Sequence, residues 1–140
     1  MKRILAVDLG TVRTGVAVAS TAVAQPLDVI EETDDERIVE RLADVARSEE
    51  ATEIVFGLPM KLDGSDGPAA TRAREIAARL EQALGVPVHL WDERLTTAQA
   101  EREMVDGGVR RKKRRASIDK IAATVLLQSY LDAQTAKGRS

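Results

Sequence analysis

The fold is decided by residues 3–19, which read RILAVDLGTVRTGVAVA. Residues 3–9 form a nearly continuous apolar run, as expected for a strand that is buried on both faces. Gly10 and Thr11 then turn the chain, and residues 14–19 return it. Because the connection is short, the two strands are predicted to form an antiparallel hairpin at the front of a sheet.

The residues that follow predict alternating strands and helices. A third strand is expected near residues 26–31, where Pro26 suits an edge strand. Apolar residues at helical spacing over 38–46 indicate a helix, with Asp34 or Asp35 as its cap. The next elements are a buried strand over 54–56, a helix over 68–84 that ends at Gly85, and a strand over 86–91.

Two further helices are expected after the last strand. Thr96 and Gln99 form a capping box for a short helix that ends at Gly107 and Gly108. The final helix is expected to begin near Ser117. The fold class is therefore α/β, with a five-stranded mixed sheet flanked by helices on both faces.

Length and composition exclude several classes of protein. The 140 residues favour a single domain, residues 1–140, and a hydrophobic fraction of 44% is enough for a core. The absence of cysteine excludes a disulfide framework, thiolate zinc sites and a cysteine nucleophile, and one histidine, His89, excludes a multi-histidine metal site. No signal peptide or membrane-spanning stretch is recognisable, so a cytoplasmic location is expected.

The net charge of -2 conceals one concentrated basic run. Six of the 21 Lys and Arg residues are consecutive, which leaves 15 to face 23 acidic residues elsewhere. Like charges repel, so the run is expected to be mobile in the free protein. Lys and Arg release counterions when they contact phosphates, so the run predicts a nucleic-acid partner, the alternative being a solvated surface loop. The run consists of Arg110, Arg111, Lys112, Lys113, Arg114 and Arg115.

Acidic residues fall at the carboxyl ends of the predicted strands, where open α/β sheets place their ligands. Asp8 ends the first strand, Asp92 and Glu93 follow the fifth, and Asp119 lies in the first turn of the expected last helix. Adjacent side chains leave a strand on opposite faces, so only one of Asp92 and Glu93 should enter a shared site. Taken singly, each acid also suits a structural role: a turn, a surface ion pair with Arg94, or a helix terminus.

Converging carboxylates repel one another, and a divalent cation with a preference for oxygen ligands would compensate. Mg²⁺ and Mn²⁺ both have that preference. Two such ions about 4 Å apart can activate water and stabilise the leaving oxygen in phosphodiester cleavage. This chemistry requires neither histidine nor cysteine, in agreement with the composition.

Four segments together resemble the YqgF/RuvX family of bacterial RuvC-like nucleases, which have a ribonuclease H-like fold. The segments are 6–17 (AVDLGTVRTGVA), 57–64 (GLPMKLDG), 92–96 (DERLT) and 119–131 (DKIAATVLLQSYL), and they cover almost the whole chain in the family's order. The resemblance implies a metal-dependent nuclease that acts in the 5' processing of pre-16S ribosomal RNA or, in an older assignment, on Holliday junctions. It implies that Asp8, Glu93 and Asp119 are catalytic and bind Mg²⁺ or Mn²⁺, with Asp92 less favoured than Glu93.

One position departs from the resolvase pattern. Resolvases typically carry a further acid three residues after the last catalytic one, and this chain has Ala122 there. The difference weakens the case for junction resolution and leaves metal-dependent cleavage intact. Further basic residues expected to contact nucleic acid, each with an internal ion pair or a solvated surface as the alternative, are Arg13, Lys61, Arg72 and Arg94.

Three other functions remain open at this point. One is a resolvase of branched DNA with the same chemistry, and another is a nucleic-acid-binding module without catalysis. The third is an ATP-binding protein of the sugar-kinase or actin type, whose phosphate loop resembles residues 8–11; the length of the chain argues against it, since those proteins need two such domains. The choice between RNA and DNA and the existence of a homodimer stay open.

Overall fold

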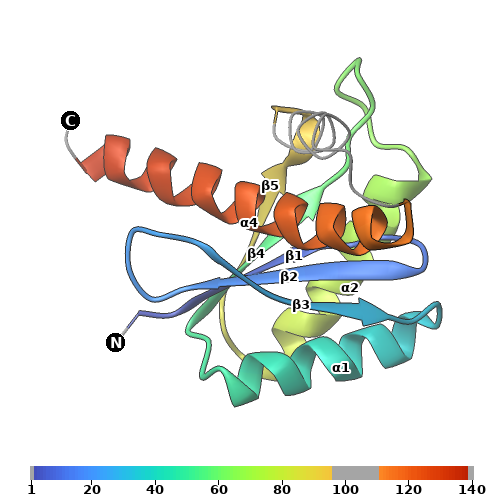
Figure 1. The fold of residues 1–140 in the computed structure, drawn as a ribbon, viewed down its shortest axis with the longest axis horizontal. Helices are drawn as coiled ribbons and strands as arrows, with labels where there is room; N and C mark the ends of the chain where they lie inside the picture. The colour runs from blue at the N-terminus through green and yellow to red at the C-terminus, as the bar shows by residue number, and fades with distance from the viewer. Residues whose placement is uncertain (1, 96–110, 139–140) are drawn as a thin grey trace.

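The computed structural model describes residues 2–95 and 111–138, with side chains from 2–94 and 121–136. Five strands form one sheet in the order β3-β2-β1-β4-β5 (Figure 1). β1 pairs antiparallel with β2 and parallel with β4, so the hairpin predicted from residues 3–19 is confirmed. The strands are β1 (Ile4–Asp8), β2 (Arg13–Ala19), β3 (Gln25–Glu31), β4 (Glu53–Leu58) and β5 (Val88–Asp92).

Helices cover both faces of this sheet, as predicted (Figure 1). α1 (Asp35–Ser48) and α2 (Pro68–Leu84) pack on one face, and α4 (Arg111–Gly138) packs on the other. Asp34 caps α1 by accepting hydrogen bonds from the backbone at positions 36 and 37. Gly85 ends α2 in the left-handed conformation that favours glycine. Within the described residues, no helix is long and apolar enough to cross a membrane.

Alternation along β1 assigns its side chains to two separate cores. Leu5 and Val7 belong to the core beneath α1 and α2, whereas Ile4 and Ala6 belong to the core beneath α4. Successive side chains of a strand point to opposite faces, so Asp8 continues the series on the α4 face. The carboxyl end of β1 therefore presents its acid beneath the helix that carries Asp119.

The last helix differs from the prediction in two respects. α4 begins at Arg111 instead of near Ser117, so Asp119 lies beyond the first turn and gains no stabilisation from the helix N-terminus. The backbone at 111–115 is helical, so these five residues belong to α4 and not to the segment before it. Lys and Arg are good helix formers, and α4 is anchored further along by packing on the sheet. The helix predicted to end at Gly107 and Gly108, together with Arg110, lies outside the described residues.

Candidate active site

Two acids from distant parts of the chain meet at the carboxyl edge of the sheet. Asp8 ends β1, and Glu93 opens a short 3-10 helix, η1 (Glu93–Leu95), directly after β5. β4 lies between those two strands, yet the Asp8 and Glu93 side chains share a hydrogen bond. Gly57 of β4 makes this possible, because it has no side chain to occupy the space that Glu93 crosses.

The two carboxyl groups are joined by a hydrogen bond, and both have raised pKa values. Burial raises the pKa of Asp8, and the hydrogen bond from Glu93 acts against this rise. Burial, the hydrogen bond to Asp8 and the negative charges of Asp8 and Asp92 raise the pKa of Glu93 to about 10. A pKa of about 10 keeps Glu93 protonated at neutral pH, so that Glu93 can donate the hydrogen bond to Asp8. Such a pair presents oxygen donors that a divalent cation can bind in place of the proton.

Asp92 occupies a different environment from its neighbour Glu93. Its carboxylate accepts hydrogen bonds from the Arg94 guanidinium, with distances of 2.9 Å from Nε and 2.6 Å from Nη2 to Oδ2. These bonds lower the pKa of Asp92. The structure thus brings Glu93 to Asp8 and leaves Asp92 to Arg94, so the two neighbouring acids point to different partners.

The third acid of the predicted set is placed by its backbone alone. Asp119 lies on α4 one helical turn before Ala123, which is fully buried in the same core as Ala6. Positions four apart share a helix face, so position 119 is on the side of α4 that packs on the sheet. The Asp119 side chain lies outside the described part of the chain, and among the described side chains no three acids or histidines form a metal-binding group. The donors that do meet, from Asp8 and Glu93, are oxygen atoms and suit Mg²⁺ or Mn²⁺.

Comparison with known proteins places the chain in a family. Residues 2–133 match the family described as RuvX, Holliday junction resolvase. The chain belongs to the RuvX family. A relative from Pelotomaculum thermopropionicum, named "Putative pre-16S rRNA nuclease", is 45% identical over 135 residues, which cover 94% of this chain and 88% of that protein. A relative of the same name from Lactococcus lactis subsp. lactis is 42% identical over 139 residues, covering 96% and 97%.

Solved structures extend this RuvX assignment to the fold. RuvC of Thermus thermophilus, in complex with a Holliday junction substrate, aligns with a TM-score of 0.62 at 16% identity and covers 96% of both chains. The yeast mitochondrial Holliday junction resolvase Ydc2 also gives a TM-score of 0.62, at 13% identity, covering 96% of this chain and 79% of that one. This RuvX chain therefore has the ribonuclease H-like fold predicted from its sequence.

Three of the arginines predicted to contact nucleic acid have partners within this RuvX chain. Arg13 forms an ion pair with Glu31 at 3.5 Å. Arg94 binds Asp92, and its Nη1 lies 3.5 and 3.4 Å from two carbonyl oxygens of the loop after β4. Arg72 pairs with Asp35 and donates to the Gly10 carbonyl. Lys61, which the sequence predicted to contact nucleic acid alongside these arginines, is exposed on the loop after β4.

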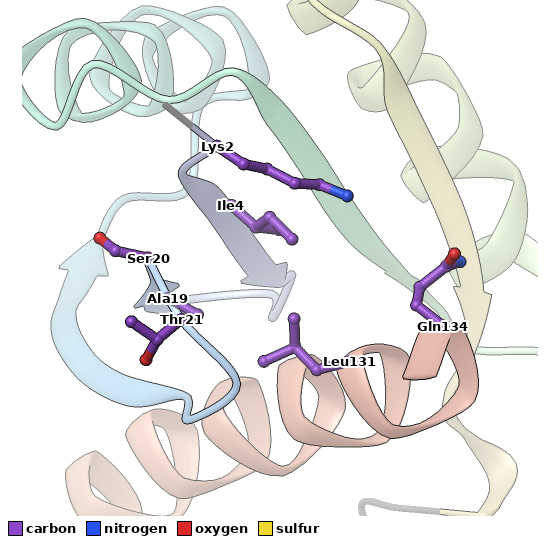
Figure 2. A pocket seen from close by; sticks show the side chains of 7 residues that line it. All are labelled: Lys2, Ile4, Ala19, Ser20, Thr21, Leu131 and Gln134. Carbon is purple, nitrogen blue, oxygen red and sulfur yellow. The ribbon is translucent and has the colours of Figure 1, made fainter. Parts of the chain in front are cut away.

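A second buried acid in this RuvX chain lies at the other end of the sheet. Glu53, 9% exposed at the start of β4, accepts a hydrogen bond from Tyr130 at 3.0 Å and pairs with His89 and Lys2, each at 3.1 Å. A cavity of about 210 Å³ lies beside it, where Lys2 extends past Ile4 toward β4 (Figure 2). Because Ile4 begins β1 and Asp8 ends it, this network lies away from the candidate active site. His89, which pairs with Glu53, also stacks on Tyr130.

Sequence reasoning did not identify two features of the site in this RuvX chain. One is the space that Gly57 leaves for Glu93; a glycine inside a buried strand signals such a close approach. The other is the contact of Arg72 with Asp35 and Gly10, which are 37 and 62 residues away along the chain. No local pattern in a single sequence carries that information.

Proposed function

We propose that the protein is a metal-dependent nuclease that hydrolyses phosphodiester bonds in the 5' processing of pre-16S ribosomal RNA. The observation that carries this proposal is the Asp8–Glu93 pair, two half-buried carboxyl groups joined by a hydrogen bond at the carboxyl edge of the sheet. Two carboxyl groups are costly to bury side by side, and a bound cation offsets that cost. The names of the curated relatives support pre-16S rRNA as the substrate.

Asp8 and Glu93 would hold Mg²⁺ or Mn²⁺, and Asp119 would complete the site from α4. When bound, the cation supplies a nucleophilic water and stabilises the leaving oxygen. The protein's own contribution is to fix the two carboxyl groups on rigid elements, since β1 is the central strand and Gly57 lets Glu93 reach across β4. The proton that Glu93 holds in the metal-free protein must leave when both groups bind a cation.

The basic run supports a nucleic-acid substrate. Its last five residues are the first five residues of α4. Asp119 lies on the same helix, eight residues after Arg111. Phosphate contacts from Lys and Arg give affinity without sequence information, so these residues would bind the substrate without selecting the cleavage position. A ribosomal RNA substrate also agrees with the cytoplasmic location expected from the sequence.

The proposal is tested by cleavage of a pre-16S rRNA fragment by purified protein with Mn²⁺ or Mg²⁺. Asp8→Asn, Glu93→Gln and Asp119→Asn should each abolish cleavage while keeping the circular dichroism spectrum. Asp44→Asn, an exposed acid on α1, is the matched control and should cleave normally. Full activity of Asp8→Asn would overturn the proposal. A larger loss for Asp92→Asn than for Glu93→Gln would transfer the metal-binding role to Asp92.

Resolution of Holliday junctions is the second candidate, favoured by the description of the matched family. The same carboxylate site would serve that reaction. Position 122, however, is a buried alanine and supplies no further acid. A synthetic four-way junction incubated beside the rRNA fragment separates the two, because paired symmetric cuts in the junction, in preference to RNA, would favour the resolvase. Metal-independent binding with no cleavage of either would indicate a binding module.

A further inference from the structure

Arg72 links three segments that are far apart in the sequence. Its Nε and Nη2 lie 3.0 and 2.9 Å from Asp35 Oδ1, at the first residue of α1. Its Nη1 donates to the carbonyl oxygen of Gly10 at 2.9 Å. Gly10 is two residues beyond Asp8, in the turn between β1 and β2. Arg72, which lies on α2, therefore connects the turn after Asp8 to both α1 and α2.

The turn itself is tightly folded. A β-carbon at Gly10 would collide with the carbonyl oxygen of Arg13, so the chain doubles back on itself at this position. The carbonyl of Val12 accepts a hydrogen bond at 2.9 Å from the backbone N–H of Glu32, which holds the far side of the turn. Arg72 holds the near side, next to Asp8. The turn is thus fixed from two directions, and the contact nearest the proposed active site is a single side chain.

The way Arg72 is engaged argues against the phosphate contact predicted from the sequence. Its Nε and Nη1 both donate within the protein, its Nη2 lies beside the Asp35 carboxylate, and its side chain is 25% exposed. A guanidinium holds two acceptors at once because its donors form a rigid planar fork. Lysine has the same charge but no fork, so it cannot reproduce both contacts.

We propose that Arg72 is a positioning residue for the proposed nuclease. By holding the Gly10 carbonyl, it fixes the backbone after Asp8 and so the position of the Asp8 carboxyl group relative to Glu93. Asp35 takes part as the acceptor that orients the guanidinium. This inference rests on the proposed function for its kinetic consequence, but the structural link from Arg72 to the turn can be observed without cleavage.

The test compares Arg72→Lys and Asp35→Asn with Arg74→Ala, and Arg72→Ala is added for the salt dependence of binding. Arg74 is the matched control, since it lies on the same helix and pairs with Asp66 at an exposed site. We expect Arg72→Lys to lower kcat at least tenfold and Asp35→Asn to lower it several-fold. Neither should change the slope of log binding affinity against log salt, and Arg74→Ala should match the wild type. In metal-free protein, the amide resonances of residues 8–12 should shift in both variants and stay fixed in the control.

Three results would overturn the inference. Wild-type kcat in Arg72→Lys would show that charge alone is sufficient. A salt slope reduced by about one in Arg72→Ala, with tighter binding in Asp35→Asn, would show that Arg72 contacts a phosphate. Unshifted resonances of residues 8–12 in both Arg72→Lys and Asp35→Asn would show that the turn does not depend on the link. If the wild type cleaves neither RNA nor DNA, the proposed function fails, and the resonances still decide whether Arg72 positions the turn.

Discussion

The side chain of Glu93 occupies the space that a side chain at position 57 would need. A β-carbon on Gly57 would stand 2.8 Å from Glu93 Cδ and 2.9 Å from Cγ, and closer still to Oε1. β4 lies between the strands that carry Asp8 and Glu93, so this space is the route by which the two carboxyl groups meet. A residue with no side chain is therefore as much a part of the candidate site as the acids are.

Gly57→Ala is predicted to displace Glu93 and abolish metal-dependent cleavage while the sheet stays folded. Gly57 is in a regular strand, where alanine is compatible with the backbone, so the cost falls on the neighbouring carboxyl group. Cleavage rate and urea unfolding measured together check this. The control is Gly85→Ala, which strains the left-handed end of α2 and should cost about 1 kcal/mol of stability without loss of cleavage. Normal cleavage by Gly57→Ala would contradict the prediction.

The sequence predicted the parts of this site that depend on local periodicity. The apolar run before Asp8 indicated a strand buried on both faces, and alternation indicated that only one of Asp92 and Glu93 turns toward Asp8. The sequence did not predict the features that depend on tertiary contacts. The start of α4 was placed too late, because six like charges suggested a mobile segment although Lys and Arg favour helices. The engagement of Arg72 depends on residues remote in sequence, so local patterns could indicate only a solvated helix face or a phosphate contact.

The metal-free protein is predicted to lose stability as the pH rises. Burial raises the pKa of Asp8, and burial together with Asp8 raises the pKa of Glu93 from 4.5 to about 10. A group whose pKa is raised by folding stabilises the fold fully below its unfolded value, and that contribution disappears as the pH rises toward its folded value. Urea unfolding midpoints in EDTA should therefore fall between about pH 5 and pH 9. Added Mn²⁺ should reverse part of the fall, since the cation replaces the proton that Glu93 holds.

Glu93→Gln separates this effect from the titration of all other groups. Its amide can still donate to Asp8 but has no proton to lose, so the metal-free variant should exceed the wild type in stability by about 1 kcal/mol or more near pH 9. It should gain no stability from Mn²⁺. Identical pH profiles for the variant and the wild type would show that the carboxyl pair does not govern stability.

Tyr130→Phe is predicted to destabilise the fold without affecting cleavage. The hydroxyl donates to buried Glu53 at 3.0 Å, and burial raises the pKa of Tyr130 to about 12, so it remains a donor throughout the ordinary pH range. Phenylalanine keeps the stacked contact with His89 and the edge contact with Trp91, so the variant removes the hydrogen bond alone. The expected cost is about 1–3 kcal/mol. A double-mutant cycle with Glu53→Gln should show coupling; additive effects would rule out a direct link.

The basic residues at the start of α4 are predicted to set the salt dependence of nucleic-acid binding. Lys112→Gln combined with Lys113→Gln removes two charges. For every phosphate that the double variant no longer neutralises, the slope of log affinity against log salt should fall by about 0.7 for single strands or 0.9 for duplexes. The decrease should be similar for RNA and DNA, because phosphate contacts carry no sequence information. Arg74→Gln, which removes a charge already paired with Asp66, is the control and should leave the slope unchanged. If the double variant also keeps the wild-type slope, these two lysines are solvated side chains, and the nucleic acid approaches the acids by another surface.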